Sequence, residues 1–153
     1  MSKITLTLKS IECLKTNETG KDELYLMLNI KDLAGQSVEL KEKFPKNEHG
    51  FWHLATGDKL ELNEVLFHGD ILRGIIIDFR FMEEDKTSGT TLSAPLEEII
   101  DDFIGEFRFI IESSGKVIYE DVRHSKLKEK VHKDYYISVS GSGADYHLWL
   151  EVK

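Results

Sequence analysis

Apolar and polar residues alternate with a period of two along most of this 153-residue chain. Ile4, Leu6 and Leu8 alternate with polar neighbours, and residues 38–44 and 59–67 repeat the pattern. Successive side chains of a strand point to opposite faces, so the alternation predicts strands with one buried face. A helical period of 3.6 is largely missing, and the chain is therefore expected to be all-β.

The longest predicted strand covers residues 71–82, in which the odd-numbered positions are mostly apolar. Further strands are predicted at residues 4–8, 24–30, 103–112, 116–121, 135–140 and 146–152. Residues 92–100 are expected to form a short helix, with Pro95 at its first position. The regular spacing of turn residues favours an antiparallel β-sandwich of about eight strands with this helix in a loop, and a closed barrel is the alternative.

Neither repeats nor a linker interrupt the sequence, so residues 1–153 are expected to form a single domain. No apolar run approaches the roughly 18 residues needed to cross a membrane. The start of the chain alternates like a strand and does not resemble a signal peptide. The lone Cys13 suits a reducing compartment. The protein is therefore expected to be cytoplasmic, or exported without a signal peptide.

The formal net charge is −8, with 28 acidic against 20 basic residues. Nucleic-acid binding is not expected, because it requires a basic face. The sequence also lacks a nucleophile elbow, a phosphate-binding loop and the zinc-binding motif of metalloproteases. These observations favour a non-catalytic binding module over an enzyme.

Acidic residues cluster in three segments that are expected to be loops or strand ends. The candidate cation ligands are Glu18, Asp22, Glu83, Asp85, Asp101 and Asp102. If these segments meet at one end of a sandwich, their carboxylates repel one another. Either the loops separate into water, or a hard cation such as calcium binds the carboxylate oxygens.

The order of these acidic residues resembles the C-two domain, the calcium-dependent lipid-binding sandwich of the synaptotagmin and protein kinase C type. Glu83 and Asp85 match the acidic pair at a strand end, and Asp102-Phe103-Ile104-Gly105 matches the Asp-apolar-Ile-Gly sequence that opens the next strand. Asp22 matches the first-loop aspartate, and Glu18 is the nearest replacement for a second one. The resemblance implies bound calcium and contact with an anionic membrane surface or a protein partner.

The glycine of that sequence, Gly105, also has a structural interpretation, because it permits a bulge or a close backbone approach. The last third of the chain, including residues 141–146, shows a faint similarity to small bacterial β-sandwich proteins that are toxin components. The alternative function is therefore a metal-independent protein-interaction sandwich, such as a toxin component, an inhibitor or an assembly subunit.

Two further segments have both a structural and a functional interpretation. Phe51 and Trp52 either cover a sheet edge or form an exposed anchor for a partner. The flanking His49 and His53 are four residues apart, but no third zinc ligand lies near them in the sequence. Lysines alternate at positions 126, 128 and 130, so they are expected to share one face of a strand. That stripe either protects a sheet edge or contacts anionic lipid.

Overall fold

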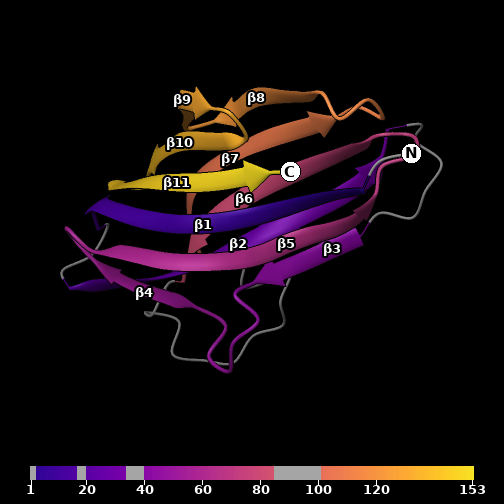
Figure 1. The fold of residues 1–153 in the computed structure, drawn as a ribbon. Coiled ribbons are helices and arrows are strands. Elements are labelled where there is room, and N and C mark those ends of the chain that lie inside the picture. Colours follow the sequence, from indigo (N-terminus) through magenta and orange to yellow (C-terminus); the bar gives the residue numbers. More distant parts are fainter. Residues whose placement is uncertain (1–2, 17–19, 34–39, 85–100) are drawn as a thin grey trace.

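The computed structural model describes residues 3–16, 20–33, 40–84 and 101–153, which contain eleven strands in two antiparallel sheets (Figure 1). The five-stranded sheet has the order β5 (Lys59–Asp70), β1 (Lys3–Lys15), β11 (Ala144–Val152), β10 (Asp134–Gly141) and β9 (Ser125–Val131). The six-stranded sheet has the order β3 (Leu40–Phe44), β2 (Lys21–Asp32), β6 (Ile75–Glu83), β7 (Asp102–Ile111) and β8 (Val117–Arg123), with β4 (Trp52–Ala55) also paired to β2.

The two sheets enclose one hydrophobic core to which both contribute side chains. The rings of Phe81 on β6 and Tyr146 on β11 meet edge to face with centroids 5.4 Å apart. Those of Phe109 on β7 and Tyr135 on β10 lie 5.0 Å apart. Buried and part-exposed residues alternate along β1 and β11, as the sequence predicts. The all-β prediction is confirmed, and sheets stacked in this way build a sandwich.

The number and limits of the strands differ from the prediction of about eight. The long strand predicted at 71–82 begins only at Ile75, because Gly74 has a φ of 79° that breaks the extended backbone. Residues 68–70, for which no strand was predicted, continue β5 to Asp70. Strand β4 likewise occupies residues outside the predicted strands. The predicted helix at 92–100 lies outside the described residues, which contain no helix.

The lysine stripe is interrupted by a β-bulge in β9. Tyr136 pairs with Glu129 and Ile137 with Leu127, so Lys128 is the extra residue. An inserted residue changes which face the following side chains occupy. Lys130 consequently lies opposite the buried Tyr135, with its Nζ 5.4 Å from the ring centroid. The expectation that residues 126, 128 and 130 share one face was wrong for this reason.

Glu64 on β5 is a part-buried carboxyl whose Oε2 is excluded from solvent and makes no hydrogen bond to the described residues. Burial raises the pKa of Glu64, and the positive charge of Lys46 offsets this only in part. A raised pKa means that the folded state favours the protonated form. This contribution to stability is present at acidic pH and is lost as the pH rises through the pKa of the folded state.

We therefore expect Glu64→Gln to raise the free energy of unfolding at neutral pH, by about 1 kcal/mol or less. Urea unfolding from pH 4 to pH 7 measures the difference in the free energy of unfolding between variant and parent. The range begins near the ordinary carboxyl pKa of about 4.3. This difference should grow as the pH rises. The exposed Glu61→Gln is the matched control, and equal effects of the two substitutions would contradict the explanation.

Candidate functional site

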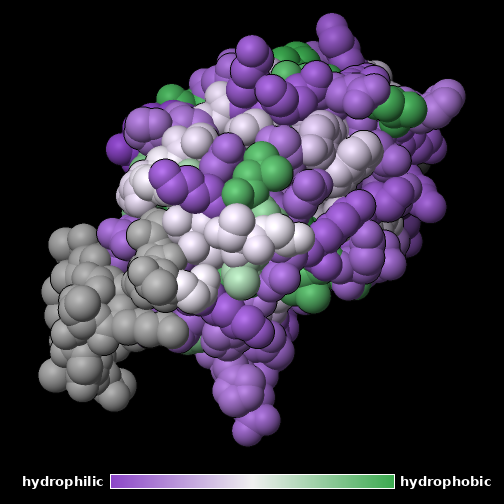
Figure 2. All heavy atoms as spheres, turned by 90° about the vertical axis from the view of Figure 1, so that its left-hand side faces the viewer, coloured by the Kyte–Doolittle hydropathy of each residue, from purple (hydrophilic) through white to green (hydrophobic). Residues whose placement is uncertain are grey.

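Strand pairing brings the described acidic candidates to one end of the six-stranded sheet, on the left in Figure 1. Leu24 on β2 pairs with Glu83 on β6, and Glu83 pairs with Asp102 on β7. Asp22 precedes Leu24 by two residues and thus shares its face, which points into the core. Viewed from this end, the surface is mainly hydrophilic, and hydrophobic side chains form separate patches (Figure 2).

Asp22 and Glu83 are buried between the sheets, and both have 0 % exposure. The hydroxyl of Tyr146 on β11 donates a hydrogen bond to Asp22 Oδ2 at 2.6 Å, which joins the two sheets. Burial, followed by this hydrogen bond, raises the pKa of Tyr146, so the phenol remains the donor. The buried Cys13 lies opposite Tyr146 on β1, and burial raises the pKa of its thiol. A buried, protonated thiol is a poor nucleophile.

Asp101 is held by a different contact, on the outer side of the six-stranded sheet. The hydroxyl of Tyr25 donates to Asp101 Oδ2 at 2.6 Å. The Nζ of Lys43 lies over the rings of Tyr25 and Phe51, at 4.5 and 4.8 Å from their centroids. These two rings meet edge to face with centroids 6.0 Å apart. The contacts fix the start of β7 beside an aromatic cluster of Tyr25 and Phe51.

Phe51 and Trp52, predicted as one possible partner surface, have different environments in the structure. Trp52 begins β4 and is 4 % exposed within the core, whereas Phe51 is part-exposed. A partner on this surface would therefore contact Phe51, not Trp52, because side chains alternate between the faces of a strand. His49 and His53 are both exposed.

Glu18 and Asp85, the remaining predicted cation ligands, lie outside the described residues. Within the described ranges, no group of three or more His, Cys, Asp or Glu side chains is arranged to hold a metal ion. Nor does this part of the chain contain a helix long and apolar enough to cross a bilayer.

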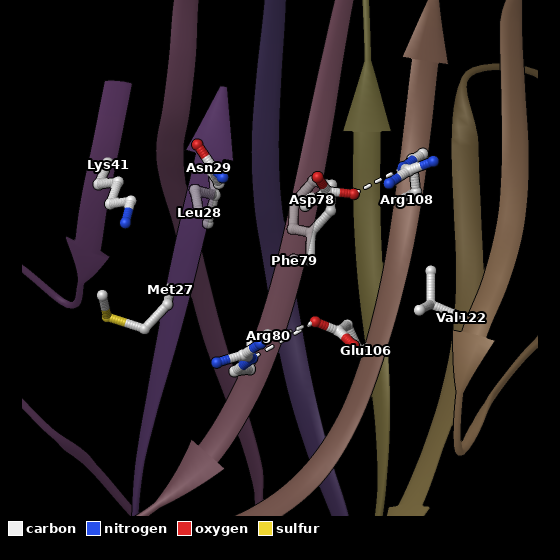
Figure 3. Close-up of a pocket in the computed structure, with 10 residues that line it drawn as sticks. All are labelled: Met27, Leu28, Asn29, Lys41, Asp78, Phe79, Arg80, Glu106, Arg108 and Val122. Atoms are coloured by element: carbon white, nitrogen blue, oxygen red, sulfur yellow. Dashed lines mark hydrogen bonds and ion pairs between the residues drawn. The ribbon is translucent and has the colours of Figure 1, made fainter. Parts of the chain in front are cut away.

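The outer face of the six-stranded sheet carries a lattice of ion pairs that the sequence analysis missed. Arg108 on β7 donates through Nε to Asp78 Oδ1 on β6 at 2.6 Å. Glu106 accepts from Arg80 and from Arg123, each at 3.2 Å. Figure 3 shows two of these pairs along a hollow of about 260 Å³.

The lattice follows from the strand register, because charged residues alternate with phenylalanines on both β6 and β7. Asn29, Asp78, Arg108 and Glu120 lie side by side across four strands. Cross-strand neighbours of opposite charge stabilise a sheet. The alternation around Asp78 and Arg80, and around Glu106 and Arg108, was visible in the sequence. Only the pairing of β6 with β7 shows that these charges oppose one another.

No protein-family model matches the chain, and no curated protein does either. The acidic end and the outer face of the six-stranded sheet are therefore the features from which a function can be inferred.

Proposed function

We propose that the chain is a non-catalytic, C-two-like module that binds calcium at its acidic end. The observation that carries the proposal is the pairing of Glu83 on β6 with Asp102 on β7, with Asp22 two residues from Leu24, the partner of Glu83 on β2. Asp101, which Tyr25 holds on the outer side of the same end of the sheet, is the fourth described candidate. In this proposal Glu18 and Asp85 complete the ligand set. Bound calcium reverses the local charge and allows contact with an anionic head group or a protein partner.

The burial of two of these carboxylates supports a cation at this end. Asp22 and Glu83 face the same side of the sheet and have no contact with solvent. Removal from water disfavours the charged form of a carboxylate, and a cation would add to the compensation that interactions within the fold already give both residues. Calcium accepts six to eight oxygen ligands in flexible geometry, which suits carboxylates from several strands.

Thermal melts in the presence of calcium test the proposal. At a calcium concentration about 100 times the dissociation constant, binding adds about 2.7 kcal/mol to the free energy of unfolding. For a chain of this length that corresponds to a rise in Tm of several degrees. Magnesium should have a smaller effect, because it requires near-octahedral geometry and loses its water reluctantly.

Asp102→Asn should abolish most of the calcium-dependent rise in Tm. The matched control is Asp121→Asn on β8, which makes the same change in charge at an exposed position in the same sheet. A parent protein whose Tm does not change at millimolar calcium would overturn the proposal. So would an equal loss in both variants.

The ion-pair lattice favours a second candidate function, a metal-independent contact with a partner protein. Glu106 and Asp78 keep only 16 % and 21 % of their side-chain surface exposed, whereas the paired Arg80 and Arg108 are 39 % and 37 % exposed and can reach a partner. Arginine and methionine are enriched in protein interfaces. The hollow between these pairs also exposes Met27. In this function the partner contacts the outer face of the six-stranded sheet.

Affinity capture from native cell extract, with a chelator present throughout, distinguishes the second function from the first. Arg80→Glu with Arg108→Glu should lose the protein that the parent captures, because both substitutions place like charges together. Lys126→Glu with Lys128→Glu reverses the same amount of charge on β9, outside the hollow, and should retain it. Capture that is unchanged by the arginine substitutions would contradict this function.

A further inference from the structure

A basic groove of about 480 Å³ lies at the end of the molecule opposite the acidic candidates. It is formed where β1 and β8 begin and where β9 and β11 end, with the start of β10 between them. The N-terminus lies on this side, on the right in Figure 1, and β11 points toward it. The acidic end instead holds the start of β2 and the end of β6. The groove is therefore independent of the proposed calcium site.

The polar lining of the groove is entirely basic, although the chain as a whole carries a net charge of −8. Its polar side chains, apart from the tyrosine of the floor, are Lys3, Lys116, Lys130, His132, Lys133 and Lys153. None of its lining side chains is a carboxylate. Several ammonium groups around one opening create a positive potential that attracts anions.

Little of this charge is compensated within the described part of the protein. Lys153 Nζ is 3.7 Å from Glu151 Oε1, and Lys130 Nζ lies over the ring of Tyr135. Among the described residues, no carboxylate comes within the 4.0 Å ion-pair distance of Lys3, Lys116 or Lys133. An anion between these lysines would reduce their mutual repulsion.

The floor of the groove is apolar and belongs to the edge of the core. Ile4, Tyr135 and Val152 line it and are 5 %, 3 % and 7 % exposed, and Val117 forms the wall on the β8 side. The bulge in β9 turns Lys130 toward the same side as Tyr135, so that a cation lies directly beside this apolar floor. Binding sites for small molecules combine such apolar walls with a few polar groups that fix orientation.

We propose that this groove binds a small anionic amphiphile, a molecule with one phosphate or carboxylate group on an apolar chain. The anionic group contacts Lys116, Lys130 and Lys133, and the apolar chain packs on Tyr135 and Val152. The apolar floor provides affinity that an inorganic anion does not gain, because burial of each methylene group contributes about 0.8 kcal/mol. The basic rim repels cationic amphiphiles and gives neutral ones no charge-charge attraction.

Calorimetric titration with octyl phosphate, in the presence of a chelator, tests the proposal. We expect octyl phosphate to bind at least tenfold more tightly than either inorganic phosphate or neutral octyl glucoside. The double variant Lys116→Gln with Lys130→Gln should weaken octyl phosphate binding tenfold or more. The control, Lys126→Gln with Lys128→Gln, removes the same charge from β9 outside the groove and should bind like the parent.

Sedimentation with phosphatidylglycerol vesicles identifies the source of the amphiphile. Vesicle binding that is lost in the groove variant assigns the ligand to a membrane lipid, and octyl phosphate binding without vesicle binding assigns it to a free molecule. Inorganic phosphate or octyl glucoside binding as tightly as octyl phosphate would overturn the proposal. An absence of octyl phosphate binding at millimolar concentration, or an equal loss in the control variant, would also overturn it.

Discussion

Phe107→Ala is expected to lower the free energy of unfolding by about 3–5 kcal/mol, the cost of removing a buried phenylalanine ring. Phe107 lies on β7 in the centre of the six-stranded sheet and has 0 % exposure. Its ring stacks on that of Phe79, with centroids 4.6 Å apart, and contacts the rings of Phe109 and Tyr119 at 6.0 Å. The truncation leaves a cavity among rigid rings that cannot close around it.

Urea unfolding measures this loss, and Phe107→Leu provides the graded comparison because it keeps most of the apolar volume. Leu72→Ala is the surface control, since Leu72 is 63 % exposed, and it should cost less than about 0.5 kcal/mol. If Phe107→Ala cost no more than Leu72→Ala, the stacked rings of Phe79 and Phe107 would not be the centre of the core.

Tyr146→Phe should lower the free energy of unfolding by about 1.5–3 kcal/mol, less than Phe107→Ala, although it removes only one oxygen atom. The phenol is the donor to Asp22 Oδ2, and both residues are fully buried. Phenylalanine preserves the packing against Phe81 but leaves the carboxylate without this donor. Hydrogen bonds to charged groups in the interior contribute more than those at the surface.

Tyr136→Phe on the neighbouring β10 is the matched control. Its hydroxyl bonds to His147 at a part-exposed position, where water can replace the lost group. We expect a cost below about 1 kcal/mol for this substitution. A double-mutant cycle of Tyr146→Phe with Asp22→Asn isolates the energy of the pair. A coupling energy close to zero would show that Tyr146 stabilises the fold through its ring alone.

Gly105 has a structural role that does not depend on calcium or on the family resemblance. Gly105 was expected to permit a bulge or a close backbone approach, and both occur. The β6–β7 register shifts between Phe81 and Met82, and a Cβ atom on Gly105 would lie 2.8 Å from the Cβ of Val139. Calcium binding itself stays a prediction, because it depends also on Glu18 and Asp85, which lie outside the described residues.

The all-β class and most of the buried positions follow from the amino-acid sequence alone. Alternation of apolar and polar residues in β1 and β11 predicts which side chains enter the core, because the two faces of a strand follow from parity alone. Local composition was a poorer guide to strand limits. Gly74 ends the extended backbone that the apolar pattern of residues 71–82 predicts, and its φ of 79° depends on the turn it occupies.

Which charges meet depends on the pairing and packing of strands. The pairing of β2, β6 and β7 places Glu83 opposite Asp102 and brings Asp22 to the same end of the sheet, and the facing sheet supplies Tyr146, 124 positions from Asp22. A bulge in β9 moves Lys130 to the groove, although its spacing predicts a common face with Lys126. Parity is a property of one strand, whereas register and bulges are set by packing between strands, and a single inserted residue reverses the face of every side chain beyond it.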